Sequence, residues 1–422
     1  MEKKNKILGA AIAANILEWY DFGLYGYFAP ILAKLFFPAE DSLRSLISTF
    51  VVFAVGFLVR PIGAVCFGHL GDRVSRHKAL GLAIMLMALP TTLMGMLPTY
   101  SQVGAGACVL LILIRIVQGF SVGGQLGTSL TVLVEHSPPG RRGFFGSWSN
   151  GGAVIGMLMG SGAGAIITRF GSPEWVNTWG WRIPFLLGAL VGIIGLYIKR
   201  STGETQAFQK ADTSGTVAEN PAKEALKHHW PVMAAATGMV WVSAVSFYMV
   251  FVYMTTYLST ETHIPLSTSL ELNTISMGFF MAILMLMGAL SDRIGRKPVL
   301  LGGAGMLIII SYPLFCLLSQ GRLLNDFMAQ MAFALAVGAI QGTLPTTIVE
   351  LFPTRIRCTA LALAYNTGFA VFGGTAPLVC TFLIQQTGDK LSPGYYLIFV
   401  SLVSGALFLG LKETFKKKLH DI

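Results

Sequence analysis

Four polar side chains fall on one face of the first long apolar stretch. Their spacing of three, three and four residues aligns them on one stripe of a helix, and they are Asn15, Glu18, Asp21 and Tyr25. A carboxyl group buried away from bulk water can take up and release a proton near neutral pH. The stripe therefore predicts that Glu18 or Asp21 carries a proton, although a fixed hydrogen bond between helices would need the same residues.

Two arginines, Arg60 and Arg115, lie deep within other apolar stretches. A guanidinium group binds a carboxylate through two parallel hydrogen bonds. Gln118 and Gln125 follow Arg115 at helical spacing and share its stripe. We expect one or both arginines to bind a substrate carboxylate. The alternative is that they neutralise the two acids of the first stretch in a structural network.

An aromatic stripe in the seventh apolar stretch offers a second kind of binding surface. Trp241, Tyr248 and Phe251 fall on one helical face, and aromatic faces attract organic cations. Packing between helices explains such a stripe equally well. Asn150 and Asn366, each in the stretch after a Glu-x-x-Pro-x-x-x-Arg motif, can be substrate contacts or hydrogen bonds between helices.

Composition indicates a polytopic helical membrane protein. The chain has 422 residues, of which 54% are hydrophobic and 12% charged, with mean hydropathy +0.65. Soluble domains carry about 25% charged residues. Stretches long enough to cross a membrane are predicted at twelve places: 7–36, 45–67, 79–98, 105–134, 143–169, 182–199, 230–258, 268–290, 298–319, 327–350, 358–386 and 394–411.

The basic residues indicate how the spans are oriented. With a cytoplasmic N-terminus, 22 of the 30 Lys and Arg residues fall on the cytoplasmic side and six on the outer side, leaving Arg60 and Arg115 in the membrane. This excess follows the positive-inside rule. We therefore expect a multi-pass protein of a bacterial inner membrane with both termini cytoplasmic. The net charge of +10 then needs no nucleic-acid partner.

Two motifs recur in the two parts of the chain. Gly68-x-x-Gly-Asp72-Arg73-x-x-Arg76 returns as Gly288-x-x-x-Asp292-Arg293-x-x-Arg296, and the motif that contains Glu135 returns at Glu350. Matching motifs in matching loops predict two pseudo-symmetric six-helix bundles, residues 1–200 and 230–422, joined by a polar cytoplasmic linker over 201–229. Glycines at 152, 156, 160 and 164 predict a close helix contact along the seam between the bundles.

These motifs resemble the loop signature of the major facilitator superfamily. Glu18–Phe22, Arg60–Gly63, Gln118–Gly124 and Trp179–Phe185 are similar to its metabolite:proton symporters, which carry proline, betaine, citrate, 2-oxoglutarate and shikimate. The resemblance implies a twelve-helix fold, with the Asp72 and Asp292 motifs as gating loops. Gln125 stands where these carriers usually have Glu, which argues against a proton role for that position.

The function expected from the sequence is proton symport of a small polar metabolite by alternating access. Two deep arginines beside several acids favour a zwitterion such as proline or betaine, while di- and tricarboxylates such as citrate remain an alternative. A non-transporting membrane sensor with the same fold is the alternative of another class. Glu135 and Glu350 are further candidate proton carriers. We expect no enzyme activity, cofactor or metal, because no catalytic or metal-ligand spacing occurs. We also expect a monomer.

Overall fold

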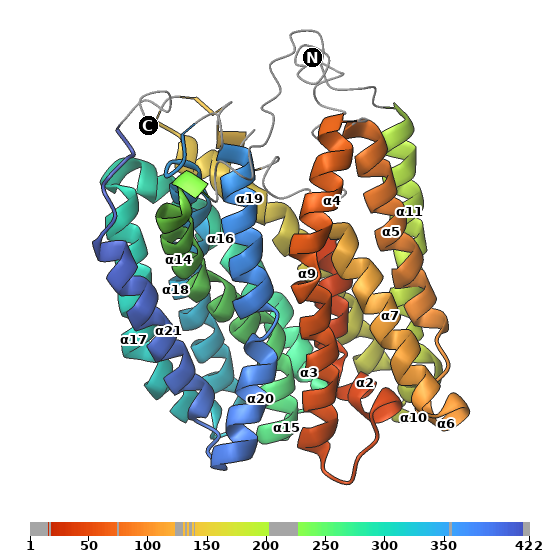
Figure 1. Cartoon of the computed structure of the whole chain (residues 1–422). Helices are drawn as coiled ribbons and strands as arrows, with labels where there is room; N and C mark the ends of the chain where they lie inside the picture. Colours follow the sequence, from red (N-terminus) through yellow and green to blue (C-terminus); the bar gives the residue numbers. More distant parts are fainter. Residues whose placement is uncertain are drawn as a thin grey trace.

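The computed structural model describes residues 16, 18–73, 76–122, 130, 133–134, 137–138, 140–201, 227–353 and 357–416. Over these residues the regular structure is entirely helical, and the long helices run side by side between two ends of one bundle (Figure 1). Nine of the described helices are long and apolar enough to cross a membrane. The other three predicted spans fall on residues 18–36 and on helices over 76–96 and 182–201.

The first half of the chain supplies the helices near the first acids and both deep arginines. Residues 18–27 are helical. The helices that follow are α2 (Ala29–Phe36), α3 (Ser42–Leu58), α4 (Arg60–Arg73), α5 (Arg76–Met96), α6 (Tyr100–Val103), α7 (Ala105–Val122), α9 (Arg142–Phe170), α10 (Pro173–Trp175), the π-helical turn η1 (Val176–Gly180) and α11 (Arg182–Ser201).

The second half repeats this arrangement of long antiparallel helices. Its elements are α14 (Trp230–Tyr248), η2 (Met249–Tyr253), α15 (Met254–Glu261), α16 (Leu266–Ile294), α17 (Arg296–Leu318), α18 (Leu323–Val349), α19 (Arg357–Gly368), η3 (Phe369–Gly373), α20 (Ala376–Thr387) and α21 (Ser392–Leu409). The π-helical turns η2 and η3 interrupt two spans in mid-helix, a distortion that sequence periodicity does not reveal.

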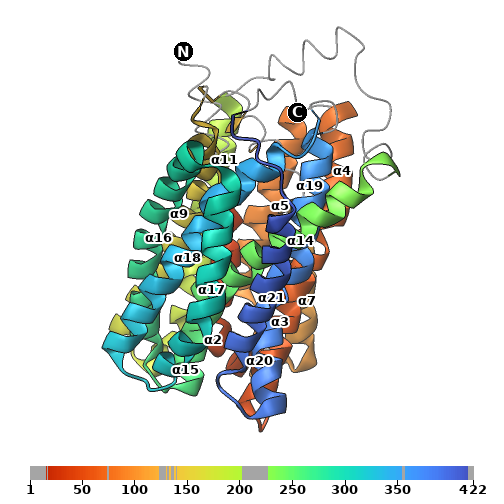
Figure 2. The same ribbon diagram turned by 90° about the vertical axis from the view of Figure 1, so that its left-hand side faces the viewer.

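The two halves meet along α9 and α16, which lie side by side in both views (Figures 1 and 2). Gly143 and Gly288 allow the close approach: a Cβ atom on Gly143 would lie 2.4 Å from the backbone oxygen of Gly288. At the end of the bundle where α16 ends, named here the Asp292 end, α18 also packs against α9. At the opposite end, the Asp41 end, Gln385 of α20 donates to Asp41 at 3.3 Å.

The predicted role of the glycine series is wrong in one respect. A Cβ atom on Gly156 would lie 2.2 Å from the backbone oxygen of Ile16, and one on Gly160 would lie 3.4 Å from that of Tyr20. Both neighbours belong to the first helix of the same half. Gly156 and Gly160 therefore seat the first helix against α9. Gly164 does reach the seam between the halves, because a Cβ atom on it would lie 3.1 Å from Leu270 Cδ1 of α16.

Candidate functional site

Arg115 and Asp21 form a buried charged pair in the first half. Arg115 Nη1 lies 3.5 Å from Asp21 Oδ2, and it also donates to Gln118 Oε1 at 3.0 Å. Gln118 Nε2 in turn donates to Asp21 Oδ1 at 2.8 Å and to Thr91 Oγ1 at 3.1 Å. The amide thus bridges the two charges, and the whole group is removed from solvent. This arrangement matches the structural-network alternative for Asp21 and for Arg115 Nη1, whereas Arg115 Nε and Nη2 are buried without a hydrogen-bond partner.

Arg60 stands in a different environment. Its guanidinium carbon lies 4.1 Å from the ring centroid of Phe22 and 3.9 Å from that of Phe57. Within the described part of the chain it forms no ion pair, and its buried Nε and Nη2 atoms have no hydrogen-bond partner. The rings stabilise the cation but offer no acceptor in the guanidinium plane. Arg60 therefore keeps donors for a carboxylate that is not part of the described chain.

Polar atoms from both halves surround Arg60 without being paired. Glu18 interacts electrostatically with Arg60, and its Oε1 atom is buried without a hydrogen-bond partner. Tyr248 of α14 packs its ring 5.1 Å from that of Phe57, and its hydroxyl group is also unpartnered. We call Glu18, Trp19, Arg60 and Tyr248 the central site, because they join the first helix, α4 and α14 at the boundary between the halves.

Trp19 supplies the aromatic part of the central site. The sequence analysis did not single out this residue. Its ring stacks 6.3 Å from Tyr248 and lies edge-on to Phe247 and Phe369 at 5.9 Å and 6.3 Å. Its indole Nε1 is buried and unpartnered. The sequence carried a signal that could have found it, because Trp19 directly follows Glu18. Phe22 carried the same signal, because it directly follows Asp21, whereas Phe57 gave none among its apolar neighbours.

The aromatic stripe of the seventh span is only partly brought to this site. Tyr248 reaches it. Trp241 instead stacks on Phe372 at 4.5 Å, and Phe251 packs against Phe280 at 4.5 Å. Seven residues separate Trp241 from Tyr248, which is two helical turns or about 10 Å along the axis. A shared helical face therefore did not mean a shared binding site.

Three other predicted contact residues make internal hydrogen bonds or are buried. Tyr25 donates its hydroxyl proton to the backbone oxygen of Thr49 at 3.0 Å. Asn150 donates to Gln341 Oε1 at 2.9 Å, and Gln341 donates to the backbone oxygen of Ser243 at 3.0 Å. Asn150 therefore joins the two halves through Gln341. Asn366 is buried on α19.

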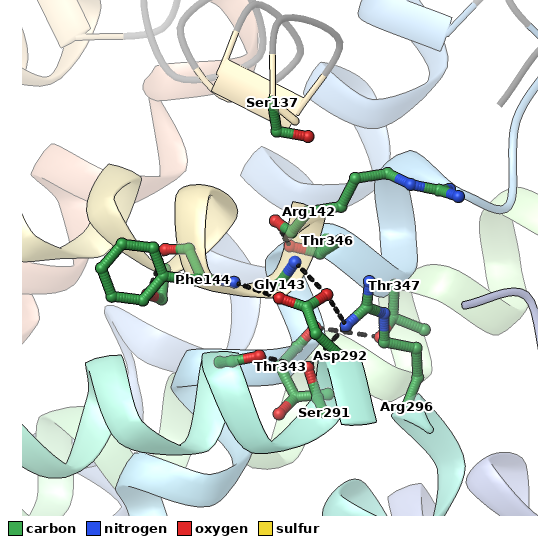
Figure 3. A network of polar contacts seen from close by, with 12 residues as sticks. Ser137, Arg142, Gly143, Phe144, Ser291, Asp292, Arg296, Thr343, Thr346 and Thr347 are labelled. Carbon is green, nitrogen blue, oxygen red and sulfur yellow. Dashed lines mark hydrogen bonds and ion pairs between the residues drawn. The ribbon is translucent and has the colours of Figure 1, made fainter. Parts of the chain in front are cut away.

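The second loop motif forms a network between the halves at the Asp292 end (Figure 3). Asp292 accepts hydrogen bonds from the backbone N–H groups of Gly143 at 2.7 Å and Phe144 at 2.9 Å. These N–H groups belong to the first turn of α9, which has no side-chain cap of its own. Asp292 therefore caps α9 from the other half, and its charge favours that positive helix end. Arg296 holds Asp292 in place at 2.9 Å.

Glu350 extends this network toward the end of the chain. It accepts from Arg142 Nη1 at 2.8 Å, and Arg296 Nη2 lies 3.3 Å away. Thr414 donates to its other oxygen at 2.6 Å. Glu413, the neighbour of Thr414, accepts from the backbone N–H of Arg296 at 2.8 Å. The residues after α21 thus stabilise the contact between the halves, which the sequence analysis did not anticipate.

The remaining predicted residues divide into three groups. Gly288 lies in the seam described above, and Arg293 is exposed. Gly68, Asp72, Arg73 and Arg76 lie on helical backbone at the ends of α4 and α5, but their side chains are not among those described. Asn15, Gln125 and Glu135 lie outside the described residues.

The comparisons with known proteins agree with this architecture. Residues 11–377 and 240–419 match the Major Facilitator Superfamily. The chain belongs to this superfamily. It is therefore a multi-pass membrane transporter and not an enzyme, as the sequence analysis expected.

Relatives of this superfamily member include bacterial osmolyte transporters. It is 34% identical to the proline/betaine transporter of Salmonella typhimurium, over 99% of this chain and 85% of the relative. It is also 34% identical to the glycine betaine/proline/ectoine/pipecolic acid transporter OusA of Dickeya dadantii, over 98% and 84%. The ectoine/proline transporter ProP of Corynebacterium glutamicum is 33% identical over 99% and 86%.

Solved structures confirm the fold of this superfamily member. The xylose transporter XylE of Escherichia coli, in a partially occluded inward open conformation, superposes with a TM-score of 0.79 over 99% of this chain and 100% of XylE. A D-xylose-proton symporter gives a TM-score of 0.75 over 94% and 96%. The identities of 18% and 20% mean that these matches establish fold alone.

Proposed function

We propose that this protein imports a small zwitterionic osmolyte or amino acid, such as proline or betaine, together with protons. The transport cycle is alternating access about the central site. The relatives transport compounds of this class by name. The observation that carries the proposal is Arg60, a buried cation with free donors, beside aromatic rings from both halves.

The site accounts for both ends of a zwitterion. The carboxylate of the substrate accepts hydrogen bonds from Arg60 Nε and Nη2, a charge-assisted contact that fits the fork of arginine. The cationic end lies against the rings of Trp19 and Tyr248, which attract an ammonium group. A tricarboxylate would require further cations, and the charge of Arg115 is already balanced by Asp21.

Coupling follows from the charge balance around Arg60. In the empty state Glu18 balances the charge of Arg60. When a substrate carboxylate binds Arg60, it replaces Glu18 as the group that balances the charge of the arginine. Glu18 is then an uncompensated buried anion unless it binds a proton. Substrate binding and protonation therefore favour each other, as linkage requires. Asp21 keeps Arg115 as its partner throughout, so we propose Glu18 as the proton carrier ahead of Asp21.

The membrane arrangement is part of the same proposal. The protein acts as a monomer in the bacterial inner membrane, with both termini cytoplasmic and residues 201–229 linking the bundles 1–200 and 230–422. The Asp292 end then faces the cytoplasm, in agreement with the excess of basic residues on that side. Modification of single cysteines placed in the two ends by a membrane-impermeant reagent tests this orientation.

The experiment on Arg60 uses purified protein and proteoliposomes. Arg60→Lys should weaken proline or betaine binding roughly 10- to 100-fold, because charged hydrogen bonds contribute about 1.5–3 kcal/mol and lysine cannot reproduce the fork. Arg44→Lys is the matched control, since Arg44 is exposed near Asp41.

Three outcomes would contradict the proposal. Unchanged binding in folded Arg60→Lys removes Arg60 from the site. Tighter binding of citrate than of any zwitterion identifies the carboxylate alternative. Failure of the protein to exchange labelled for unlabelled ligand across the membrane identifies a sensor.

A further inference from the structure

A second buried carboxyl group lies in the second half of the protein, away from the central site. Asp326, in the first turn of α18, has no exposed surface. Neither of its carboxylate oxygens has a hydrogen-bond partner. Among the described residues it forms no ion pair, and Arg322, which precedes α18, is exposed. A fully charged carboxylate in this position would be strongly destabilising.

Gln330 gives an independent indication that something binds here. It follows Asp326 by one helical turn, on the same buried face of α18. It is also fully buried, and neither its amide nitrogen nor its oxygen has a partner. Four unpaired polar atoms on one turn of a buried helix face are costly unless a further group, such as a proton or an ordered water, satisfies them.

The electrostatic surroundings determine which sign of charge is needed. Tyr257 of α15 interacts with Asp326, Glu261 and Asp389. Lys390 is already paired with Glu261 at 3.8 Å, and its backbone oxygen accepts from the Tyr257 hydroxyl at 3.1 Å. Tyr257 is the titratable neighbour that links Asp326 to other groups. The titratable and charged groups around Tyr257 are mainly acidic or neutral: Glu261 from α15, Cys316 from α17, Asp326 itself, and Asp389 and Lys390 before α21.

Two further considerations select a proton over a metal ion. Divalent metal ions take about six or more oxygen ligands, whereas Asp326 and Gln330 provide three unpartnered oxygens between them. The described residues also contain no group of three or more His, Cys, Asp or Glu side chains that could hold a metal ion. The dipole of α18 favours an anion near its start. However, no backbone N–H donates to Asp326, so the dipole alone does not solvate the charge.

We propose that Asp326 is a proton-binding group of the second half, distinct from Glu18 and Asp21, with Gln330 as its polar partner. The proton stays bound while α15, α17 and α18 pack as observed. It is released when water reaches this turn from the Asp41 end. The pH of the compartment at that end then changes the stability of the packing around α18. The proposal rests on the structure and not on the proposed transport function.

Infrared spectroscopy of the purified full-length protein, without substrate, tests the proposal directly. A protonated carboxyl group has a carbonyl band separate from that of a carboxylate. Asp326→Asn should remove a protonated-carboxyl band that the unmodified protein shows at mildly acidic pH, whereas Glu174→Gln, at an exposed acid, should leave that band in place. Gln330→Leu keeps the acid and should shift the band without removing it. The Gln330 variant decides the question if Asp326→Asn does not fold.

Thermal unfolding provides a second readout. A proton held in the folded state and lost on unfolding stabilises the protein at low pH, and this stabilisation is lost as pH rises. The unfolding midpoint should therefore fall more in the unmodified protein than in Asp326→Asn as pH rises from about 4, the ordinary range of a free aspartic acid, toward neutral pH.

Two results overturn the proposal. The first is an identical infrared spectrum for the unmodified protein and Asp326→Asn. The second is loss of the Asp326 band when sodium or magnesium chloride replaces choline chloride, which would show that a metal ion is the ligand. Failure of proton-driven transport, by contrast, would leave this result unaffected.

Discussion

At the scale of single residues, the two deep arginines have different partners despite their similar sequence context. Both contact Phe22: the guanidinium carbon lies 4.1 Å from the ring centroid in Arg60 and 4.5 Å from it in Arg115. Arg115 Nη1 has both an ion-pair partner, Asp21, and a hydrogen-bond partner, Gln118. Arg60 forms no ion pair among the described residues, and Glu18 is the acid that interacts with it electrostatically. In both arginines Nε and Nη2 lack a hydrogen-bond partner. The difference determines which arginine can change partner during a transport cycle.

This difference predicts opposite consequences for the two acids. Glu18→Gln should abolish proton-driven accumulation while substrate exchange across the membrane survives, since exchange needs no net proton movement. Uptake into proteoliposomes under an imposed pH gradient, compared with counterflow, separates the two activities. Accumulation by Glu18→Gln at the unmodified rate would place the proton on another group, with Asp21 the next to test.

Removal of Asp21 should act mainly on stability. Asp21→Asn leaves Arg115 buried without its counter-charge, which costs about 3–5 kcal/mol for a buried pair. The double variant Asp21→Asn with Arg115→Gln removes both charges and should recover much of this loss. Thermal unfolding of the single and double variants measures the coupling. Additive losses would show that the pair is not a unit.

The sequence was a good guide to residue types and a poor one to partners. Glu18, Asp21, Arg60 and Arg115 stand out because charge is rare in apolar stretches. Which acid pairs with which arginine depends on how residues 18–27, α4 and α7 pack, and helical spacing within one element holds no information on that. For the same reason the stripe of Trp241 and Tyr248 did not reveal that their partners differ.

At the scale of elements, the contact between α9 and α18 depends on the absence of a side chain. A Cβ atom on Gly146 would lie 1.9 Å from Thr346 Oγ1. Gly146→Ala should therefore prevent close packing at the Asp292 end and favour conformations that are open there.

The matched test is the double variant Gly146→Ala with Thr346→Ala, which removes the clashing oxygen and should restore packing in part. The rate of modification of a cysteine introduced at the Asp292 end reports the open population. Equal rates in the single and double variants would mean that the glycine is not needed for closure.

Helix positions were largely predictable, since all twelve predicted apolar stretches fall on helices wherever the structure describes them. The interruptions were not. The π-helical turns at 249–253 and 369–373 occur within uninterrupted apolar sequence. They depend on packing between the spans, such as Tyr248 against Phe369 at 6.2 Å.

At the scale of the whole molecule, a largely buried charged network joins the halves at the Asp292 end, and an exposed ion pair, Arg169 to Glu271 at 3.7 Å, joins α9 to α16 toward the other end. Asp292→Asn keeps the shape of the side chain but removes its charge toward α9 and Arg296. It should weaken closure of the Asp292 end by about 1–2 kcal/mol, the usual contribution of a helix cap and dipole. Cysteine accessibility at both ends should shift in opposite directions, and a shift at one end alone would exclude a rocking motion.

The cap that Asp292 places on α9 also makes amide hydrogen exchange a measure of how the halves separate. The amide protons of Gly143 and Phe144 are held by a carboxylate that belongs to the other half, so they exchange with water chiefly when the halves part. Their rate of deuterium uptake therefore reports how readily the Asp292 end opens, averaged over the sample, without a label, a substrate or a membrane potential. A ligand that slows their exchange stabilises the closed Asp292 end, and a ligand that speeds their exchange favours the conformation in which this end is open.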